Sequence, residues 1–209
     1  MCGFVGIINQ KSNSVYDLRS ELIAMTQSIS HRGPDGQGFY INEEEGIYFG
    51  HRRLSIIDLS ENGSQPMTSK CGGYILIFNG EIYNYQKIKN KFSKNFPWSS
   101  NTDTEVLLEA LVNFGVEETL SQLEGQFSFG LYNLKDKELI IARDISGEKP
   151  LFYSQLNDFF IFGSELKSLY CSKILPNKLN YQSVANFLKY SFYILRINSW
   201  INYMHIVKI

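Results

Sequence analysis

Cys2 is the residue of this 209-residue chain with the clearest potential for covalent chemistry. The thiolate is the nucleophilic form of cysteine, and removal of Met1 would leave a free α-amine on the same residue. An α-amine has an ordinary pKa of roughly 7.7–8.0, so it can take the thiol proton near neutral pH. Nucleophile and base would then stand together without a separate histidine. A lone cysteine is nevertheless a weak signal, and its simpler interpretation is a small apolar residue that opens a buried strand.

Other residues could contribute binding or transition-state stabilisation. Asn79-Gly80 offers a side-chain amide and a backbone N–H to a developing oxyanion, although Asn-Gly between apolar segments is also typical of a hairpin turn. Arg53 carries a planar guanidinium that matches a carboxylate, whereas most single arginines are simply solvated. Asp103 could bind a cation or cap the helix that follows it. We interpret His31 as a residue that orders its loop, since the α-amine already supplies a base.

Two kinds of apolar pattern predict the elements that must position these residues. Short apolar runs between Gly, Asn and polar turns predict strands over 3–9, 38–41, 47–57, 74–79, 127–133, 139–143, 151–155 and 159–163. Apolar residues at helical spacing predict one helix after a capping pair formed by Ser14 and Asp17, and a second that starts within 101–104 and ends at Gly115. No helix-length segment separates the last four strands, so they should pair antiparallel.

Composition and charge exclude several classes of function. Lys and Arg number 20 against 21 Asp and Glu, a formal net charge of −1, so no nucleic-acid or anionic-membrane partner is indicated. Cys2, Cys71 and Cys171 are far apart and form no C-x-x-C pair, so neither a disulfide framework nor a zinc site is expected. The sequence shows neither a signal-peptide layout nor the ~20 apolar residues of a membrane span. We therefore expect a cytoplasmic protein.

A set of short motifs occurs in a fixed order along the chain. They are Cys2-Gly3, His31-Arg32-Gly33-Pro34-Asp35, Arg53-Leu54-Ser55-Ile56, Asn79-Gly80-Glu81-Ile82-Tyr83-Asn84, Thr102-Asp103-Thr104-Glu105, Arg143-Asp144, Gly147-Glu148-Lys149-Pro150-Leu151-Phe152-Tyr153 and Ser164-Glu165-Leu166-Lys167. In this order and at these spacings they closely resemble the glutaminase half of glutamine-hydrolysing asparagine synthetases. These enzymes are class II glutamine amidotransferases with the N-terminal-nucleophile hydrolase fold. The resemblance covers roughly residues 1–170 and favours a catalytic Cys2 over a structural one.

The resemblance implies a role for each candidate residue. Cys2 would be the nucleophile, and Asn79 with Gly80 would form the oxyanion hole. Arg53, rather than its neighbour Arg52, would hold the α-carboxylate of L-glutamine, because it directly precedes the motif's Leu-Ser-Ile. Asp103, helped by Glu81, would pair with the α-ammonium. Further contacts to the substrate are expected from Leu54, Ser55, Ile56 and Ile57.

The resemblance also implies an α+β fold: a four-layer αββα sandwich of two antiparallel sheets. We divide the chain into an amidotransferase domain over residues 1–175 and a connecting helix with a truncated or divergent tail over 176–209. After Tyr170 the resemblance thins, and 179–188 still looks like the family's short connecting helix. The segment 194–200 matches nothing in the family.

The Ser-Gly-Gly-x-Asp-Ser loop of the family's ATP-using synthetase domain does not occur in the sequence. No cofactor is therefore expected in this chain, and ATP and Mg²⁺ are expected only for the missing synthetase domain, which would act as a partner in trans. Amidation of a surface-polysaccharide sugar is an alternative function. Amidotransferases serving sugar phosphates or purine synthesis rank lower, and a non-catalytic glutamine-binding module or remnant stays open. The ammonia acceptor and the oligomeric state do not follow from the sequence.

Overall fold

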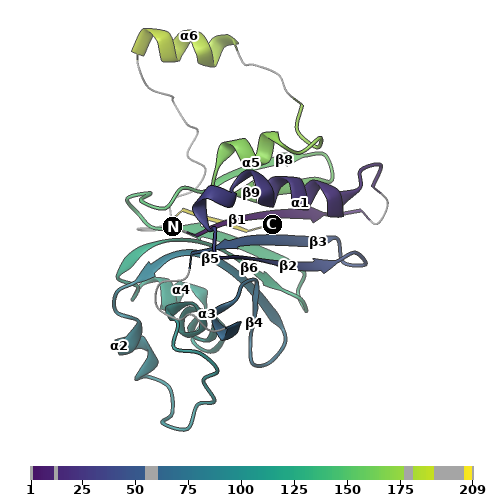
Figure 1. Cartoon of the computed structure of the whole chain (residues 1–209). Helices are drawn as coiled ribbons and strands as arrows, with labels where there is room; N and C mark the ends of the chain where they lie inside the picture. Colours follow the sequence, from purple (N-terminus) through teal and green to yellow (C-terminus); the bar gives the residue numbers. More distant parts are fainter. Residues whose placement is uncertain (1, 12–13, 55–60, 177–180, 191–204, 209) are drawn as a thin grey trace.

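Two stacked antiparallel sheets form the centre of the protein (Figure 1). The computed structural model describes residues 2–11, 14–54, 61–176, 181–190 and 205–208. Sheet A has the order β2-β3-β1-β9-β8, and its strands are β1 (Gly3–Asn9), β2 (Gly36–Asn42), β3 (Ile47–Arg53), β8 (Phe152–Leu156) and β9 (Phe159–Gly163). Sheet B has the order β10-β7-β6-β5-β4, and its strands are β4 (Met67–Thr68), β5 (Tyr74–Ile82), β6 (Gly125–Asn133), β7 (Glu138–Arg143) and β10 (His205–Lys208).

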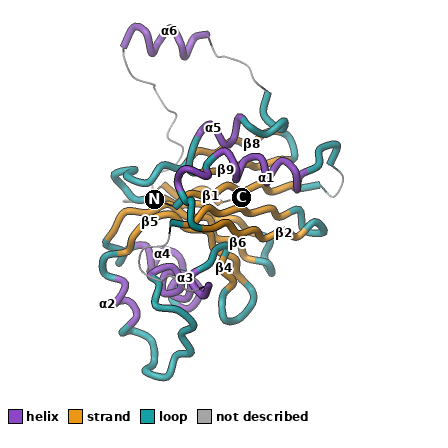
Figure 2. Tube along the Cα trace, viewed as in Figure 1, coloured by secondary structure: helices purple, strands orange, loops and turns teal. Residues whose placement is uncertain are grey.

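Helices cover the outer face of each sheet, as the purple and orange layers of Figure 2 show. Sheet A is covered by α1 (Leu18–Ser28) and α5 (Leu166–Tyr170), and sheet B by α2 (Tyr85–Lys89), α3 (Asp103–Asn113) and α4 (Val116–Leu120). Two short 3₁₀ turns span Ser30–Arg32 and Glu61–Gly63, and α6 (Tyr181–Tyr190) lies apart from the layers. The expected four-layer αββα sandwich and the antiparallel pairing are confirmed.

Apolar side chains fill the space between all four layers. Because successive strand residues point to opposite faces, β5 places Ile75 and Ile77 between the two sheets and Leu76 and Phe78 against α3. The space between the sheets is the interlayer below. Its buried residues are Phe4, Ile8, Ile47, Phe49, Ile75, Ile77, Tyr132, Leu139, Ile141, Phe160 and Phe162.

Phe162 shows how closely the two sheets approach. A Cβ added to Gly6 of β1 would stand 2.2 Å from its ring, and one added to Gly130 of β6 would stand 2.8 Å from it. One ring therefore lies over two glycines, one from each sheet, and side chains at either position would separate the layers. Such close packing fixes the position of sheet A against sheet B.

One local expectation needs correction, and two of the alternative interpretations are excluded. Helix α1 is capped by Asp17, whose carboxylate accepts from the Ser20 N–H, so Ser14 lies outside the helix rather than at its cap. Asn79-Gly80 is not a hairpin turn, because β5 continues without interruption to Ile82. The cap of α3 is Thr102, so capping does not explain Asp103.

Several short helices and strands were not predicted from the sequence. They are β4, β10, α2, α4 and α5, each of five residues or fewer. Strand β10 pairs with β7 at the edge of sheet B, so residues 205–208 of the divergent tail join the sandwich. The unmatched segment 194–200 lies outside the described residues. Within the described part of the chain, no helix combines the length and apolar character needed to cross a membrane.

Candidate functional site

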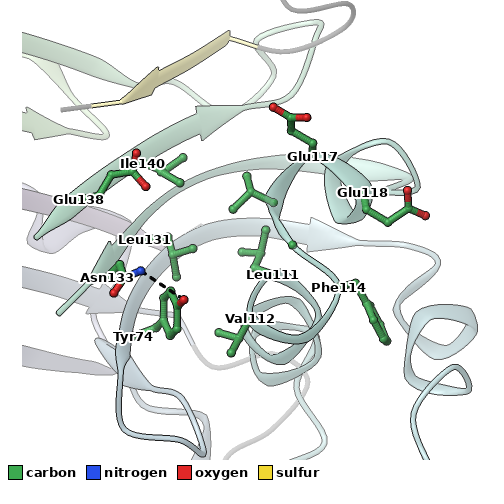
Figure 3. Close-up of a pocket in the computed structure, with 12 residues that line it drawn as sticks. Tyr74, Leu111, Val112, Phe114, Glu117, Glu118, Leu131, Asn133, Glu138 and Ile140 are labelled. Carbon is green, nitrogen blue, oxygen red and sulfur yellow. Dashed lines mark hydrogen bonds between the residues drawn. The ribbon is translucent and has the colours of Figure 1, made fainter. Parts of the chain in front are cut away.

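A cavity between sheet B and its helices does not coincide with the expected site. It has a volume of about 590 Å³ and is lined by residues of α3, α4 and β5–β7, among them Tyr74, Leu111 and Glu138 (Figure 3). These residues lie where β5 and β7 begin, whereas Asn79 and Gly80 lie near the other end of β5. None of the described residues expected to bind or transform a substrate lines this cavity.

Cys2 lies directly before β1 and is held by the residue that follows β3. The Leu54 N–H donates to the Cys2 Sγ at 3.3 Å, and the thiol lies 3.6 Å from the Leu54 carbonyl oxygen. These contacts continue the β1–β3 ladder, in which Gly3 is opposite Arg52. The sulfur therefore lies beside the end of β3.

The alternation of side chains places Cys2 and Arg53 on the same face of sheet A. Phe4 of β1 and Phe49 of β3 lie in the interlayer. Cys2 is two residues from Phe4, and Arg53 is four residues from Phe49, so both belong to the interlayer face. A guanidinium nitrogen of Arg53 lies 2.6 Å from the position of a Cβ added to Gly63.

Arg52 points to the opposite face of sheet A, where its side chain forms hydrogen bonds. Its Nε donates to the Gly33 carbonyl at 3.1 Å, and its Nη1 donates to Gln37 at 3.0 Å. Strand alternation puts Arg52 on the face opposite Arg53. The geometry therefore favours Arg53 as the arginine that faces the interlayer, and its role in substrate binding stays a prediction.

Asn79 and Glu81 lie on the interlayer face of sheet B, because they continue the alternation of Ile75 and Ile77. A hydrogen bond between the sheets aligns this end of β5 with the end of β3. The His51 Nε2 lies 3.2 Å from the carbonyl oxygen of Phe78, the residue before Asn79. Cys2, Arg53, Asn79 and Glu81 therefore converge on one end of the interlayer from two different sheets.

The amide of Asn79 is buried and has an unused donor. The residue is only 1% exposed, and its Nδ2 has no hydrogen-bond partner among the described residues. A buried amide N–H without an acceptor costs free energy, on the order of 1–3 kcal/mol. Such a donor is suited to a group that arrives only during a reaction, such as an oxyanion.

Gly80 packs closely against β6. A Cβ at this position would stand 2.3 Å from the Gln126 carbonyl oxygen and 2.7 Å from the Cα of Phe127. Both contacts are to backbone, which cannot move aside without disturbing the sheet. This position therefore requires glycine, for packing rather than for an unusual φ.

Asp103 meets the same end of β5 from the first turn of α3. Its Oδ2 accepts from the Ile82 N–H at 3.0 Å, and the residue is 5% exposed. Burial raises the pKa of Asp103, and the neighbouring charge of Glu81 adds to the rise, while backbone N–H donors from Ile82 and Thr104 oppose it. A cation between Asp103 and Glu81 would stabilise both carboxylates in their charged form.

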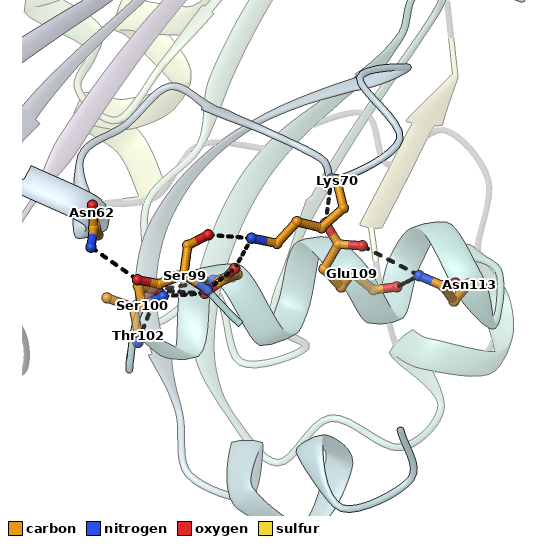
Figure 4. A network of polar contacts seen from close by, with 8 residues as sticks. Asn62, Lys70, Ser99, Ser100, Thr102, Glu109 and Asn113 are labelled. Atoms are coloured by element: carbon orange, nitrogen blue, oxygen red, sulfur yellow. Dashed lines mark hydrogen bonds and ion pairs between the residues drawn. The ribbon is translucent and has the colours of Figure 1, made fainter. Parts of the chain in front are cut away.

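A polar network around the buried Glu105 carboxylate, the α3 anchor, fixes the start of α3 (Figure 4). It consists of Lys70, Ser99, Ser100, Thr102 and Glu105. The Glu105 carboxylate accepts from the backbone N–H groups of Ser99 at 2.9 Å and Ser100 at 2.7 Å, and pairs with Lys70 at 2.9 Å. Burial would raise the pKa of Glu105, but the hydrogen bonds from Ser99, Lys70 and Ser100 lower it. The network holds the helix turn that carries Asp103.

A second polar cluster, the N-terminal anchor, holds the backbone at Cys2. It consists of His31, Arg32, Glu165 and Lys167. The Arg32 Nε donates to the Cys2 carbonyl at 2.9 Å, and its Nη1 pairs with Glu165 at 3.1 Å. Glu165 also contacts His31 at 2.8 Å and Lys167 at 3.4 Å. Burial would raise the pKa of Glu165, but hydrogen bonds from His31 and Arg32 lower it.

Some expected site residues lie outside the described residues, namely Ser55, Ile56 and Ile57, as does Met1. Two polar residues near the site had no role in the sequence analysis, His51 and Gln65. His51 is two residues from both Phe49 and Arg53, and this spacing could have shown that it shares their face. No comparable signal marks Gln65.

Comparisons with known proteins agree with this arrangement. A family model described as a glutamine amidotransferase domain matches residues 1–208. The chain is 46% identical over 171 residues to asparagine synthetase (glutamine-hydrolyzing) 1 of Bacillus subtilis, covering 81% of this chain and 26% of that protein. It is 33% identical over 171 residues to asparagine synthetase B (glutamine-hydrolyzing) of Escherichia coli, covering 81% and 30%. The chain thus spans less than a third of the length of either relative.

Solved structures of low sequence identity share the fold. A Bacillus subtilis glutamine phosphoribosylpyrophosphate amidotransferase complexed with ADP and GMP superposes with a TM-score of 0.67 at 20% identity, covering 81% of this chain and 43% of that one. The structure of an allosteric regulatory enzyme of purine biosynthesis gives 0.68 at 21% identity, with the same coverage. These likenesses confirm the expected N-terminal-nucleophile hydrolase type of sandwich. By its sequence match over nearly its whole length, the chain belongs to the glutamine amidotransferase domain family.

Proposed function

We propose that this chain is the glutaminase half of a glutamine-hydrolysing asparagine synthetase. The observation that carries the proposal is the buried Asn79 amide. It has no partner among the described residues and points from sheet B into the interlayer that Cys2 faces from sheet A. Arg53 on sheet A would bind the carboxylate of L-glutamine, and Asp103 on α3 with Glu81 on sheet B would bind the ammonium. Leu54, Ser55, Ile56 and Ile57 would line the substrate. Holding a zwitterion at both ends is worth several kcal/mol of the barrier.

The reaction would proceed through a thioester on Cys2. After removal of Met1, the α-amine takes the thiol proton, and the sulfur attacks the side-chain amide carbon of glutamine. Asn79 Nδ2 and the Gly80 N–H stabilise the resulting oxyanion, and loss of one such donor typically costs ~10²–10³ in rate. The ammonium form of the α-amine then gives its proton to the departing ammonia. Water hydrolyses the glutamyl thioester to glutamate and regenerates the thiol.

The ammonia would serve a synthetase domain or subunit in trans. There ATP and Mg²⁺ would activate aspartate, and ammonia would convert β-aspartyl-AMP to asparagine. The names of the relatives support this acceptor. The proposed division of the chain keeps residues 1–175 as the amidotransferase domain and 176–209 as its connecting segment. The three free cysteines of the described residues support a cytoplasmic setting.

Glutaminase activity of a matched set of variants tests the proposal. We expect the chain to release glutamate and ammonia from L-glutamine, and Cys2→Ala to abolish this release. Cys71→Ala and Cys171→Ala are controls, because both thiols are free and exposed. Equal activity in Cys2→Ala and the unchanged chain would rule the mechanism out. Mass spectrometry of the purified chain should show that Met1 has been removed.

A further inference from the structure

Beyond the stretch of β5 that pairs with β4, side chains bond the backbone groups on that edge of β5. Strand β4 pairs only with Ile75 and Leu76. Beyond it, the Phe78 N–H donates to the Gln65 Oε1 at 2.6 Å, and the Phe78 carbonyl contacts the His51 Nε2 at 3.2 Å. Both backbone groups of an edge-strand residue are therefore satisfied by side chains rather than by a neighbouring strand.

The next backbone groups along this edge belong to Gly80. In an antiparallel strand, alternate residues direct their N–H and C=O to the same edge, so Phe78, Gly80 and Ile82 share one edge. The Ile82 N–H is bonded to Asp103 at 3.0 Å. The Gly80 N–H thus lies between two positions whose backbone donors are already bonded to side chains. Among the described residues, the edge is therefore closed by side chains on either side of Gly80.

Both side chains that bond Phe78 are enclosed; His51 comes from sheet A, and Gln65 comes from the connection between β3 of sheet A and β4 of sheet B. His51 is 1% exposed and Gln65 is 7% exposed. His51 belongs to β3, two residues before Arg53, and Gln65 lies on the segment that follows β3. The backbone of Gln65 is pressed against β2, since a Cβ on Gly38 would stand 2.0 Å from the Gln65 carbonyl oxygen. The two bonds therefore tie β5 to the part of sheet A that carries Arg53.

The protonation state of His51 suits a fixed hydrogen bond. Burial lowers the pKa of His51 to about 4, and the charge of Arg53 contributes, although the bond to Phe78 opposes the shift. At neutral pH the ring is uncharged, and a bond to a carbonyl requires the proton on Nε2. The Nδ1 is then an acceptor, and it has no partner among the described residues. The ring acts as a donor to Phe78 and not as a base.

We propose that His51 and Gln65 are positioning residues for the oxyanion hole, which hold Phe78 so that Asn79 and Gly80 keep their place opposite Cys2. The inference rests on the proposed glutaminase function. The nucleophile and the oxyanion donors stand on different sheets, so their distance depends on bonds that cross between the sheets. A displacement of about 1 Å in such a site can cost ~10² in rate. Arg53 and Asp103 also stand on opposite sides of the interlayer, but an ion pair weakens only gradually with distance, whereas a hydrogen bond to an oxyanion requires a narrow range of distance and angle.

The test compares His51→Leu and Gln65→Leu with His51→Gln. Leucine removes the hydrogen bond and keeps most of the volume, whereas a glutamine Nε2 lies as many bonds from the Cα as the histidine Nε2. Thr119→Val is the matched control, because the Thr119 Oγ1 also donates to a buried carbonyl, that of Ala110, at 2.9 Å. Glutaminase kcat and KM, the Kd for L-glutamate and the thermal midpoint are measured for each chain.

We expect both leucine variants to lower kcat by about 10- to 100-fold. KM for glutamine and Kd for glutamate should stay within about threefold, because the groups that bind the zwitterion are unchanged. His51→Gln should recover most of the lost kcat, and Thr119→Val should keep the full kcat even if its thermal midpoint falls.

Two results would overturn the inference while the proposed function stands. One is an active unchanged chain whose leucine variants keep the full kcat. The other is a loss of both kcat and glutamate affinity in the leucine variants that His51→Gln does not recover. Such a result would indicate a general loss of structure and not a specific effect on the oxyanion hole. An unchanged chain that does not hydrolyse glutamine would instead contradict the proposed function itself.

Discussion

Sheet A and sheet B contribute different parts of the site and hold them by different means. Sheet A carries Cys2, whose backbone is held by the N-terminal anchor. Two side chains of that cluster reach solvent, His31 at 53% and Lys167 at 51% exposure, whereas Arg32 is 10% exposed. Sheet B carries the Asn79-Gly80 pair and meets α3, where the Glu105 side chain of the α3 anchor is only 5% exposed. Exposed ion pairs are weak and screened by salt, whereas breaking a buried network is costly.

This difference indicates how each half of the site responds to change. The sheet B half depends on shape and on enclosed hydrogen bonds, so small alterations there should have large effects at any ionic strength. The sheet A half depends on charges near water, so its response should be smaller and should vary with salt. Four measurements can contradict or sharpen this contrast.

The largest effect is expected for Gly80→Ala on sheet B. The new Cβ would meet the Gln126 carbonyl oxygen at 2.3 Å and the Phe127 Cα at 2.7 Å, so β5 must move away from β6. Displacing one oxyanion donor should lower glutaminase kcat by ~10³, and overpacking should cost about 1–3 kcal/mol of stability. Gly36→Ala on sheet A is the control, since its nearest neighbour is an Arg53 Cβ at 3.8 Å. Equal kcat in the two variants would refute the contrast.

Glu105→Ala should be the most destabilising change of a charged residue. It removes the acceptor of the Ser99 and Ser100 N–H groups and leaves Lys70 without its carboxylate. We expect a loss of about 3 kcal/mol in the free energy of unfolding, measured by urea denaturation, with little dependence on salt. Glu124→Ala is the matched control, because its side chain is 69% exposed and its contact with Lys87 is 3.9 Å long. A loss below about 1 kcal/mol for Glu105→Ala would contradict a stabilising α3 anchor.

Features that depend on neighbouring residues can be predicted from the sequence, whereas features that depend on distant contacts cannot. Periodicity is enough for β1, whose bounds match the prediction, because a strand buried on both faces is a continuous apolar run. The start of α3 is also predictable, since capping chemistry is local. The sequence does not single out Asp17 as the cap of α1, because Ser14 is an equally good cap by residue type. In the structure the Ser14 hydroxyl instead accepts from the Tyr16 N–H.

Features that depend on distant contacts do not follow from periodicity. The pairing of β1 with β9 joins residues at least 150 positions apart, and β10 pairs with β7 through a segment without strand-like alternation. The motifs pointed to Arg53, Asn79 and Asp103, but nothing in the pattern shows that Gln65 closes the edge of β5. That contact forms because β4 begins only at Met67, after Gln65, so β5 has no paired strand opposite Phe78.

Acid should weaken the protein through His51, which joins the two sheets. Its pKa of about 4 in the folded chain lies below the ordinary value of 6.5, so the unfolded chain binds the proton first as pH falls. The stabilisation is fully present above about pH 6.5 and is lost as pH falls towards about 4, a total of ~3 kcal/mol at about 1.36 kcal/mol per pH unit.

His51→Gln isolates this contribution, because glutamine does not titrate. Urea denaturation of both chains between pH 7 and pH 4 should give stability curves that differ in slope. Asp103, with a raised pKa, and Glu105 and Glu165, with lowered pKa values, titrate in both chains and cancel in the difference. Parallel curves would show that His51 is not held neutral by burial.

The smallest effect is expected for Glu165→Gln in the N-terminal anchor. Glu165 pairs with Arg32, His31 and Lys167, but its own side chain is 22% exposed, so each pair is partly solvated. We expect a loss of ~0.5–1 kcal/mol at low ionic strength. In 1 M NaCl, where the Debye length is about 3 Å, the difference from the unchanged chain should nearly vanish. Arg32 keeps its bond to the Cys2 carbonyl in this variant, so glutaminase kcat should fall far less than in Gly80→Ala. A loss that persists in high salt and equals that of Glu105→Ala would mean that both halves of the site are held in the same way.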